Sequence, residues 1–244
     1  MINWNEEKIR FFKDASEYTG YHKNIADSIK PYLKSEWTMC DMGCGLGLLD
    51  IQLADSVAHI TAVDRNESAI RDYCKRVKNL NISNISAQVG DANEMGRAFW
   101  DVLLLSFFSF YGDNDAMERA LARARRRIIM VTFVDEFPEK QRKFSNSNIH
   151  ETTSAKEAYI LGKGYNYEKI ITTMEFGQPF RSLDDAREFF HQYSEGEYMK
   201  EEDSEKRKLN IELKMSDIVM TDDDTEFPYF LSKKKDVGVL IVDV

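Results

Sequence analysis

The 244-residue sequence predicts an α/β fold with a doubly wound, mostly parallel sheet, and three observations support this prediction. Short apolar segments alternate with segments of helical spacing as far as residue 134. Residues 101–107 are almost continuously apolar, which is typical of a parallel strand covered on both faces. A glycine-rich turn, from Gly43 to Gly47, directly follows the first predicted strand.

The elements up to residue 134 follow from the spacing of apolar residues. Residues 6–34 are predicted to be helical because apolar side chains recur at intervals of three and four, as at Ile25 and Ile29. Short runs rich in Val, Ile and Leu predict strands. The predicted strands are 38–42, 59–63, 82–89, 101–107 and 128–134, and the helices among them are 48–54, 67–80 and 115–125.

After residue 134 the alternation is less regular, although we still expect one domain over residues 1–244. We divide it into an N-terminal helical cover (1–35), a cofactor-binding core (36–134) and a C-terminal part (135–244). The C-terminal part is expected to hold a polar loop or lid at 135–150, a helix at 153–161, a strand at 167–176, a helix at 184–193, and a closing antiparallel hairpin formed by 229–231 and 237–242.

Charge and cysteine content narrow the classes of function. The formal net charge is −9, and an acidic surface repels phosphate backbones, so we do not expect DNA binding. No apolar run approaches the ~20 residues of a membrane span, and residues 1–8 lack the apolar core of a signal peptide. Cys40, Cys44 and Cys74 are odd in number and are predicted to be reduced thiols. We therefore expect a cytoplasmic protein without membrane association.

The glycine-rich turn predicts a ligand site. A loop between a buried strand and a helix N-terminus presents free N–H groups, and its glycines let a ligand approach the backbone. A dinucleotide-binding turn needs glycines at its first, third and sixth positions. Counted from Gly43, the sixth position is Leu48, which argues against a nicotinamide-dependent oxidoreductase. The sequence instead has Asp41 followed by a Gly-x-Gly-x-Gly turn.

Polar residues also stand at the ends of the next three strands. Asp64 follows the second strand, where an acid can hold the two hydroxyls of an adenosine ribose. Asp91 follows the third strand, near the place expected for an adenine amine, and Ser106 ends the fourth. Because the carboxyl ends of parallel strands open into one crevice, these residues are predicted to share a single site.

Together these residues resemble the class I S-adenosylmethionine-dependent methyltransferases over residues 38–134. Residues 177–180 before a helix, and the final strands, resemble the small-molecule-type members of that superfamily. The resemblance implies a Rossmann-like three-layer sandwich with a seven-stranded sheet, whose antiparallel last strand lies beside the sixth. It also implies S-adenosylmethionine as the cofactor, S-adenosylhomocysteine as its product, and no required metal.

The resemblance assigns roles to individual residues. The glycine turn would line the methionine and ribose portion, with Asp41 ionised beside the methionine ammonium. Asp64 would hold the ribose, Arg65 would flank the adenine, and Ser106 would offer its backbone to the methionine end. The N-terminal helical part, with Tyr18, Tyr21 and His22, would cover the cofactor. The implied cofactor-binding residues are Tyr21, Asp41, Gly43, Cys44, Gly45, Gly47, Asp64, Arg65, Asp91, Ala92 and Ser106.

The sequence departs from one motif of the superfamily and identifies no catalytic residue. Ser106-Phe107-Phe108-Ser109 stands where an Asn-Pro-Pro-Tyr motif would follow the fourth strand, which counts against the amine methylation that this motif supports. Methyl transfer from a sulfonium chiefly requires a correctly placed nucleophile, and a base only if the acceptor carries a proton. His150 is a weak candidate for that base. Phe107, Phe108, Phe110 and Tyr111 either form an apolar acceptor pocket or pack the sheet.

The leading hypothesis is therefore a monomeric or homodimeric enzyme that methylates an unidentified small molecule by in-line transfer. The alternatives are an RNA or protein methyltransferase and a non-catalytic protein that binds S-adenosylmethionine.

Three other groups of residues receive structural interpretations. Cys40 and Cys44 lack the additional ligands of a metal site. Arg123 and Arg125–Arg127 are predicted to form a solvated helix end, where the helix dipole favours cations. Asp222–Asp224 lack the ligand spacing of a calcium loop and are predicted to form a solvated turn.

Overall fold

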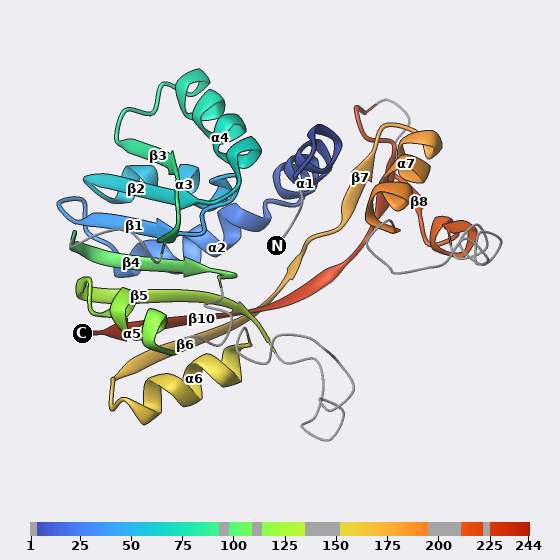
Figure 1. The fold of residues 1–244 in the computed structure, drawn as a ribbon. Coiled ribbons are helices and arrows are strands. Elements are labelled where there is room, and N and C mark those ends of the chain that lie inside the picture. Colours follow the sequence, from blue (N-terminus) through green and yellow to red (C-terminus); the bar gives the residue numbers. More distant parts are fainter. Residues whose placement is uncertain (1–3, 93–97, 109–113, 135–151, 195–210, 222–224) are drawn as a thin grey trace. The chain divides into compact units, whose positions relative to one another are not determined.

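The structure is a computed structural model that describes residues 4–92, 98–108, 114–134, 152–194, 211–221 and 225–244 (Figure 1). It contains two compact units. The larger unit comprises residues 22–174 and 235–244, and the smaller comprises residues 1–21 and 175–234. The expectation of one domain over the whole chain remains a prediction.

A seven-stranded sheet forms the centre of the larger unit, with the strand order β3-β2-β1-β4-β5-β10-β6 (Figure 1). Its strands are β1 (Thr38–Met42), β2 (His59–Asp64), β3 (Ile85–Val89), β4 (Trp100–Ser106), β5 (Ala124–Phe133), β6 (Tyr167–Glu175) and β10 (Lys234–Asp243). The helices that accompany them are α2 (Tyr21–Ile29), α3 (Leu48–Leu53), α4 (Glu67–Asn79), α5 (Asn114–Leu121) and α6 (Thr153–Gly162), with short 3-10 helices at Lys30–Tyr32 and Ala54–Ser56.

The strand directions confirm the predicted topology. Strands β1 to β5 pair in parallel along the order of the sheet, and β10 runs antiparallel to β5. In the sheet order, β10 lies between β5 and β6. This is the Rossmann-like, mostly parallel arrangement with an antiparallel last strand that the resemblance implies.

The core of the larger unit follows from the alternation of side chains along the strands. On one face, Leu103, Ile128 and Leu240 are fully buried against residues of α5 and α6 such as Met117 and Ile160. The neighbouring strand residues, including Met39, Leu104 and Ile129, are also fully buried and point to the opposite face. A sheet covered on both faces requires nearly continuous apolar strands, which explains the run at 101–107.

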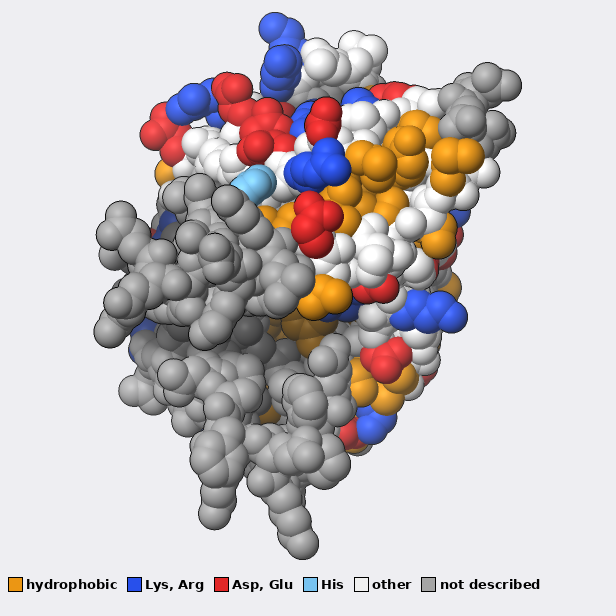
Figure 2. Space-filling model, turned by 90° about the vertical axis from the view of Figure 1, so that its right-hand side faces the viewer, with side chains coloured by type: hydrophobic (Ala, Val, Ile, Leu, Met, Phe, Trp, Pro, Cys, Tyr) orange, Lys and Arg blue, Asp and Glu red, His pale blue; other side chains and the backbone are white. Residues whose placement is uncertain are grey.

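The described part of the smaller unit combines helices with a three-stranded antiparallel sheet. Its helices include α1 (Glu6–Thr19) and α7 (Leu183–Ser194), and residues 211–215 are also helical. Its strands, in the order β7-β9-β8, are Gln178–Phe180, Tyr229–Leu231 and Val219–Met220. The core contains Phe11, Phe180 and Ala186, with Phe189 packed against them. Figure 2 shows hydrophobic side chains at the surface of one face of the molecule. In the smaller unit, the side chains of Leu183, Val219 and Met220 are exposed.

Two predictions about secondary structure are wrong. The predicted hairpin does not form, because β9 pairs with β7 and β8 while β10 pairs with β5 in the other sheet. Residues 234–236, which lie between the two predicted strands of the hairpin, belong instead to β10, which begins at Lys234. The expected helix end at Arg125–Arg127 is instead the start of β5. In both places the local residue pattern was overridden by pairing between distant parts of the chain.

The remaining predicted elements lie close to their observed positions. The long N-terminal helix is divided at Gly20, which ends α1 in the left-handed conformation with φ of 67°. The predicted lid at 135–150 lies outside the described residues, as do Phe110, Tyr111 and His150. None of the helices described is long and apolar enough to span a bilayer.

Candidate functional site

The glycine turn between β1 and α3 has the backbone that a close-approaching ligand requires. Gly43, Gly45 and Gly47 all have positive φ, at 80°, 53° and 63°, a conformation that other residues adopt only with strain. The carbonyl oxygen of Val63, in β2, accepts hydrogen bonds from the N–H groups of Gly43 (2.7 Å) and Cys44 (3.1 Å). The turn is thus fixed against the neighbouring strand.

The three glycines differ in what surrounds them. A Cβ on Gly43 would overlap the ring of Phe108, and a Cβ on Gly47 would overlap the ring of Tyr73. A Cβ on Gly45 would meet no atom within 4 Å. Gly43 and Gly47 are therefore required by packing, whereas Gly45 is the point at which the backbone faces open space.

Asp64 joins this turn to the end of β2. Its Oδ2 accepts a hydrogen bond from the Gly45 N–H (2.9 Å), and its Oδ1 accepts one from the Asn66 N–H (2.7 Å). Each carboxylate oxygen can accept a second hydrogen bond, so the group retains the capacity to bind ligand hydroxyls. The sequence predicted Asp64 as a ligand-binding acid, and the structure adds its role in holding the glycine turn.

The carboxyl ends of β2, β3 and β4 lie at the same edge of the sheet, with β1 between β2 and β4. The N–H of Gly90 donates to the Asp64 carbonyl oxygen (3.0 Å), and Arg65 forms an ion pair with Asp91. Ala92 is buried in the core cluster, and Ser106 is half-buried at the end of β4. The structure therefore brings the predicted residues of the larger unit to one edge of the sheet. The contacts that each makes with a cofactor remain predictions.

A buried group of three residues lies beneath the glycine turn. Asp41 and Asp50 are almost completely buried, and the Tyr73 hydroxyl donates to Asp50 Oδ2 (2.8 Å). The two carboxyl groups lie close enough for each to influence the pKa of the other. Within the described part of the chain, Oδ1 of each carboxyl group has no hydrogen-bond partner.

Burial governs the protonation of this pair. Removal from water raises the pKa of Asp41 well above its usual range, and the nearby Asp50 raises it further. Burial also raises the pKa of Asp50 to about 6, although hydrogen bonds from Tyr73 and Asp41 act in the opposite direction. The pair therefore holds a proton at pH values where exposed aspartates are ionised. The sequence predicts that Asp41 is ionised when a ligand ammonium lies beside it. That prediction concerns the ligand-bound protein and stays a prediction.

Sequence reasoning placed Asp41 in the site but missed Asp50 and Tyr73. One signal was available: Asp50 is the only charged residue in the mostly apolar segment from Leu48 to Leu53. An acid at such a position has to be hydrogen-bonded or exposed, and here it is fully buried against the Tyr73 hydroxyl.

The charges of this edge favour a cationic ligand. Asp41 interacts electrostatically with both Asp50 and Asp64. None of the three forms an ion pair with a basic side chain among the residues that the structure describes. An ammonium or sulfonium group placed near them would offset this negative charge.

The end of β4 contains a conformational outlier. Phe107 has φ of 50°, which is rare for a bulky residue without an amide or carboxylate side chain. Its ring stacks on Phe133 with centroids 4.4 Å apart, and its N–H donates to the Val131 carbonyl oxygen (2.8 Å). Strain of this kind concentrates at binding sites. Phe107 and Phe108 therefore remain candidates for the walls of an acceptor pocket.

The N-terminal cover is not tested by this structure, because Tyr18 and Tyr21 belong to the smaller unit. Within that unit, the buried Tyr21 ring packs against Phe176 at 4.3 Å, and burial raises its pKa. His22 begins the larger unit, where burial and the charge of Arg76 lower its pKa to about 3. A histidine with this pKa is neutral at physiological pH and is a poor proton acceptor.

The three cysteines differ in exposure: Cys40 is buried, Cys44 is half-buried and Cys74 is exposed. All three are free thiols, and burial raises the pKa of both Cys40 and Cys44. Among the described residues, no group of three His, Cys, Asp or Glu side chains is arranged to hold a metal ion. Asp222–Asp224 lie outside those residues.

Comparison with known families gives a match over most of the larger unit. The sequence profile of a family described as "Methyltransferase domain" matches residues 33–174. The curated ribosomal protein L11 methyltransferase of Phocaeicola vulgatus is 30% identical over 91 residues. That match covers 35% of this chain and 32% of the relative, so the chain spans about a third of the curated protein that it matches.

Solved structures share the fold at low sequence identity. A Bacillus halodurans protein aligns with a TM-score of 0.59 and 13% identity, covering 91% of this chain and 97% of its own. The precorrin-6y C5,15-methyltransferase of Geobacter metallireducens aligns with a TM-score of 0.52 and 12% identity, covering 90% and 86%. A SAM-dependent methyltransferase of Aquifex aeolicus aligns with a TM-score of 0.52 and 14% identity, covering 70% and 94%. At these identities the similarity concerns the fold.

Proposed function

Because this chain belongs to the methyltransferase-domain family, we propose that it transfers a methyl group from S-adenosylmethionine to a small-molecule acceptor in the cytoplasm. The observation that carries the proposal is the glycine turn, in which Gly45 faces open space and donates its N–H to Asp64. A turn of this kind, joined to an acid at the next strand end, suits a ligand that combines a ribose with a charged tail.

The residues at this edge fit the cofactor in charge as well as in shape. S-adenosylmethionine carries a sulfonium and an ammonium, and the buried Asp41 Oδ1 has no partner in the described part of the chain. In our proposal Asp41 lies nearest the ammonium and Asp64 accepts the ribose hydroxyls. The other residues of the set are Gly43, Cys44, Gly45, Gly47, Arg65, Asp91, Ala92 and Ser106, with Tyr21 as part of the cover.

For methyl transfer, the protein chiefly has to position the acceptor relative to the cofactor. The bound cofactor supplies a methyl group on a positively charged sulfur, which is already activated for transfer. The chain must hold an acceptor atom in line with that methyl group and exclude competing water. We assign Phe107 and Phe108 to this apolar wall, and we assign no general base.

Binding of S-adenosylhomocysteine, measured by isothermal titration calorimetry, tests the cofactor site. Asp64→Asn should weaken binding by about 1–3 kcal/mol, since the amide loses the charged acceptor for ribose hydroxyls. Asp55→Asn, which changes an exposed acid after α3, is the matched control and should leave binding unchanged. Absence of wild-type binding at millimolar ligand would refute the proposal, provided that circular dichroism shows a folded protein.

A second candidate is methylation of a protein, because the curated relative acts on ribosomal protein L11. Incubation of a cell extract with the enzyme and radiolabelled S-adenosylmethionine, followed by size separation, distinguishes the two. Label in the small-molecule fraction supports our proposal, whereas label in protein supports the alternative. Tight cofactor binding without label in either fraction, or in RNA, would favour a non-catalytic role.

A further inference from the structure

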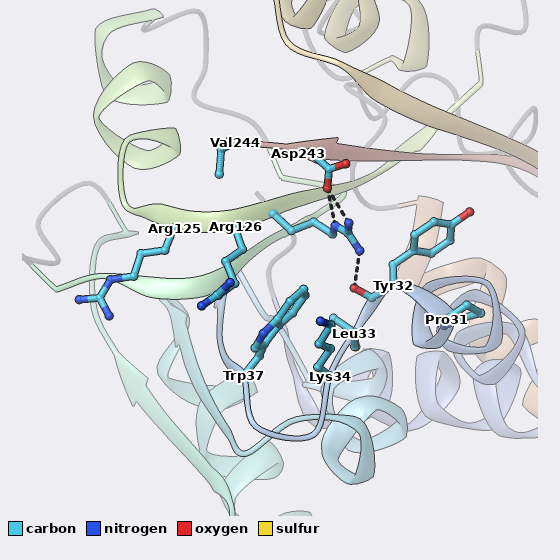
Figure 3. Close-up of a pocket in the computed structure, with 10 residues that line it drawn as sticks. Pro31, Tyr32, Leu33, Lys34, Trp37, Arg125, Arg126, Asp243 and Val244 are labelled. Atoms are coloured by element: carbon cyan, nitrogen blue, oxygen red, sulfur yellow. Dashed lines mark hydrogen bonds and ion pairs between the residues drawn. The ribbon is translucent and has the colours of Figure 1, made fainter.

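A basic hollow lies at the opposite edge of the seven-stranded sheet, where β1 and β5 begin (Figure 3). Its volume is about 450 Å³, and its lining includes Tyr32, Lys34, Trp37 and the three arginines Arg125–Arg127. We call it the basic hollow. The length of β1, about 16 Å for five residues, separates it from the glycine turn.

The basic hollow concentrates positive charge on a chain whose net charge is −9. Arg127 is paired with Asp243 (2.6 Å), and Arg126 is paired with Asp101 (3.1 Å). Lys34 and Arg125 form no ion pair with the part of the chain that the structure describes. The hollow therefore has more cations than carboxylates to neutralise them.

Aromatic contacts and hydrogen bonds hold Lys34, Arg126 and Arg127 in place, whereas the guanidinium carbon of Arg125 lies over the Phe99 ring, 5.6 Å from its centre. The Trp37 ring lies 5.3 Å from the Lys34 Nζ and 5.7 Å from the guanidinium carbons of Arg126 and Arg127. Arg127 also donates to the Tyr32 carbonyl oxygen (2.8 Å). Figure 3 shows the Trp37 ring between Arg126 and Lys34. Fixed cations lose little freedom when an anion binds, which favours affinity.

The Asp101 carboxylate connects Arg126 to the first residues of β1 and β4. Its Oδ2 accepts hydrogen bonds from the Thr38 N–H (2.9 Å) and hydroxyl (3.0 Å), and its Oδ1 accepts from Arg126. The Thr38 N–H and hydroxyl, together with Arg126, keep the pKa of Asp101 below its usual value. Arg126 is thus anchored to the paired starts of β1 and β4 rather than to a loop.

From these observations we propose that the basic hollow is a second ligand site, for a small molecule that carries two or more linked phosphate groups. Guanidinium groups match phosphate oxygens in geometry, and Lys34 and Arg125 are the cations of the hollow without a carboxylate partner among the described residues. A volume of about 450 Å³ suits a small molecule. Cations on both sides of Trp37 favour a chain of phosphates over a single one. The site is separate from the proposed methyl-transfer site.

Calorimetry with tripolyphosphate at low salt tests this site. The double variant Lys34→Ala/Arg125→Ala should weaken binding at least tenfold. Lys75→Ala/Lys78→Ala removes the same charge from the exposed face of α4, and should change affinity less than twofold. Equal losses in both variants, or no wild-type binding at millimolar tripolyphosphate, would overturn the proposal.

Additional probes define the ligand and guard against misfolding. Adenosine triphosphate is the second probe. If it binds more tightly than tripolyphosphate and loses affinity in Lys34→Ala/Arg125→Ala, the result supports a nucleotide as the source of the phosphates. Nucleotide binding unaffected by the variant would place it elsewhere and count against the hollow. A short RNA that binds more tightly than either probe would overturn the small-ligand proposal. Binding of S-adenosylhomocysteine and the thermal transition should be unchanged in both double variants. Lys34→Glu, which reverses a charge in the hollow, should also weaken tripolyphosphate binding.

Discussion

The two ends of the same strands carry opposite charge. At the carboxyl ends, Asp41, Asp50 and Asp64 gather around a glycine turn with no basic partner among the described residues. At the amino ends, Lys34 and Arg125 accompany two paired arginines. Both sites adjoin the same apolar sheet, so the difference concerns the residues at and just beyond the two ends of the strands. A parallel sheet can thus present two chemically opposite binding edges without a change in its packing.

The largest effects are expected for substitutions in the glycine turn, where one glycine is required for packing and another for ligand binding. Gly47→Ala should lower the free energy of unfolding by about 3 kcal/mol or more, since it combines backbone strain with overlap against Tyr73. Gly45→Ala carries only the strain, about 1–2 kcal/mol, but it should weaken S-adenosylhomocysteine binding more than tenfold. Urea unfolding and calorimetry measure the two effects. Equal destabilisation by both substitutions would show that Tyr73 can move aside.

The next effect is a pH dependence that arises from Asp50. Because its folded pKa is raised to about 6, the folded state holds the proton more tightly than the unfolded chain does. This stabilisation is complete below about pH 4 and is lost as the pH rises through about 6. Asn cannot titrate, so the stability of the wild type relative to Asp50→Asn should fall by on the order of 2 kcal/mol between pH 4 and 7.

Asp55 provides the matched comparison for that measurement. It is exposed, and hydrogen bonds from Ser56 and Lys30 lower its pKa. The stability of the wild type relative to Asp55→Asn should therefore rise, not fall, as the pH increases through the acidic range. A pH-independent difference between the wild type and Asp50→Asn would mean that folding does not raise the pKa of Asp50.

A smaller effect concerns the coupling of cofactor binding to protons. If the ammonium of the ligand lies beside Asp41, binding favours the ionised carboxyl group and releases a proton. Affinity for S-adenosylhomocysteine should then rise with pH between 5 and 7, by at most about tenfold per unit. Calorimetry in buffers with different ionisation enthalpies counts the released protons. Asp41→Asn should abolish the release, and no release from the wild type would place the ammonium elsewhere.

The smallest effect is expected at the basic hollow. The ion pair of Asp243 with Arg127 is largely exposed on the aspartate side, so Asp243→Asn should change the free energy of unfolding by less than about 1 kcal/mol. The same substitution removes a negative charge from the hollow and should tighten tripolyphosphate binding by about two- to fivefold. Asp217→Asn, an exposed change in the smaller unit, should do neither. Unchanged tripolyphosphate affinity in Asp243→Asn would argue that the anion binds away from Arg127.

Much of the fold and part of the site could be read from the sequence. The strands at 38–42 and 59–63 lie almost where their apolar patterns predicted, because buried strands require apolar side chains and these are visible in the sequence. The glycines and Asp64 were recognised because a turn with positive φ and an acid at a strand end leave a local signature. Asp50, Tyr73 and the arginines of β5 were missed or misplaced, because their roles depend on partners that lie far away in the chain.

The order of residues alone determined the apolar strands, the glycine turn and the acids at the strand ends, since each depends on neighbours within a few positions. Only the tertiary structure decided that β9 and β10 enter different sheets, that Asp41 and Asp50 share a buried environment, and that Lys34 and Trp37 meet the arginines of β5. The physical reason is that these features depend on contacts between segments tens of residues apart, which pairing and burial select but local residue preference does not specify.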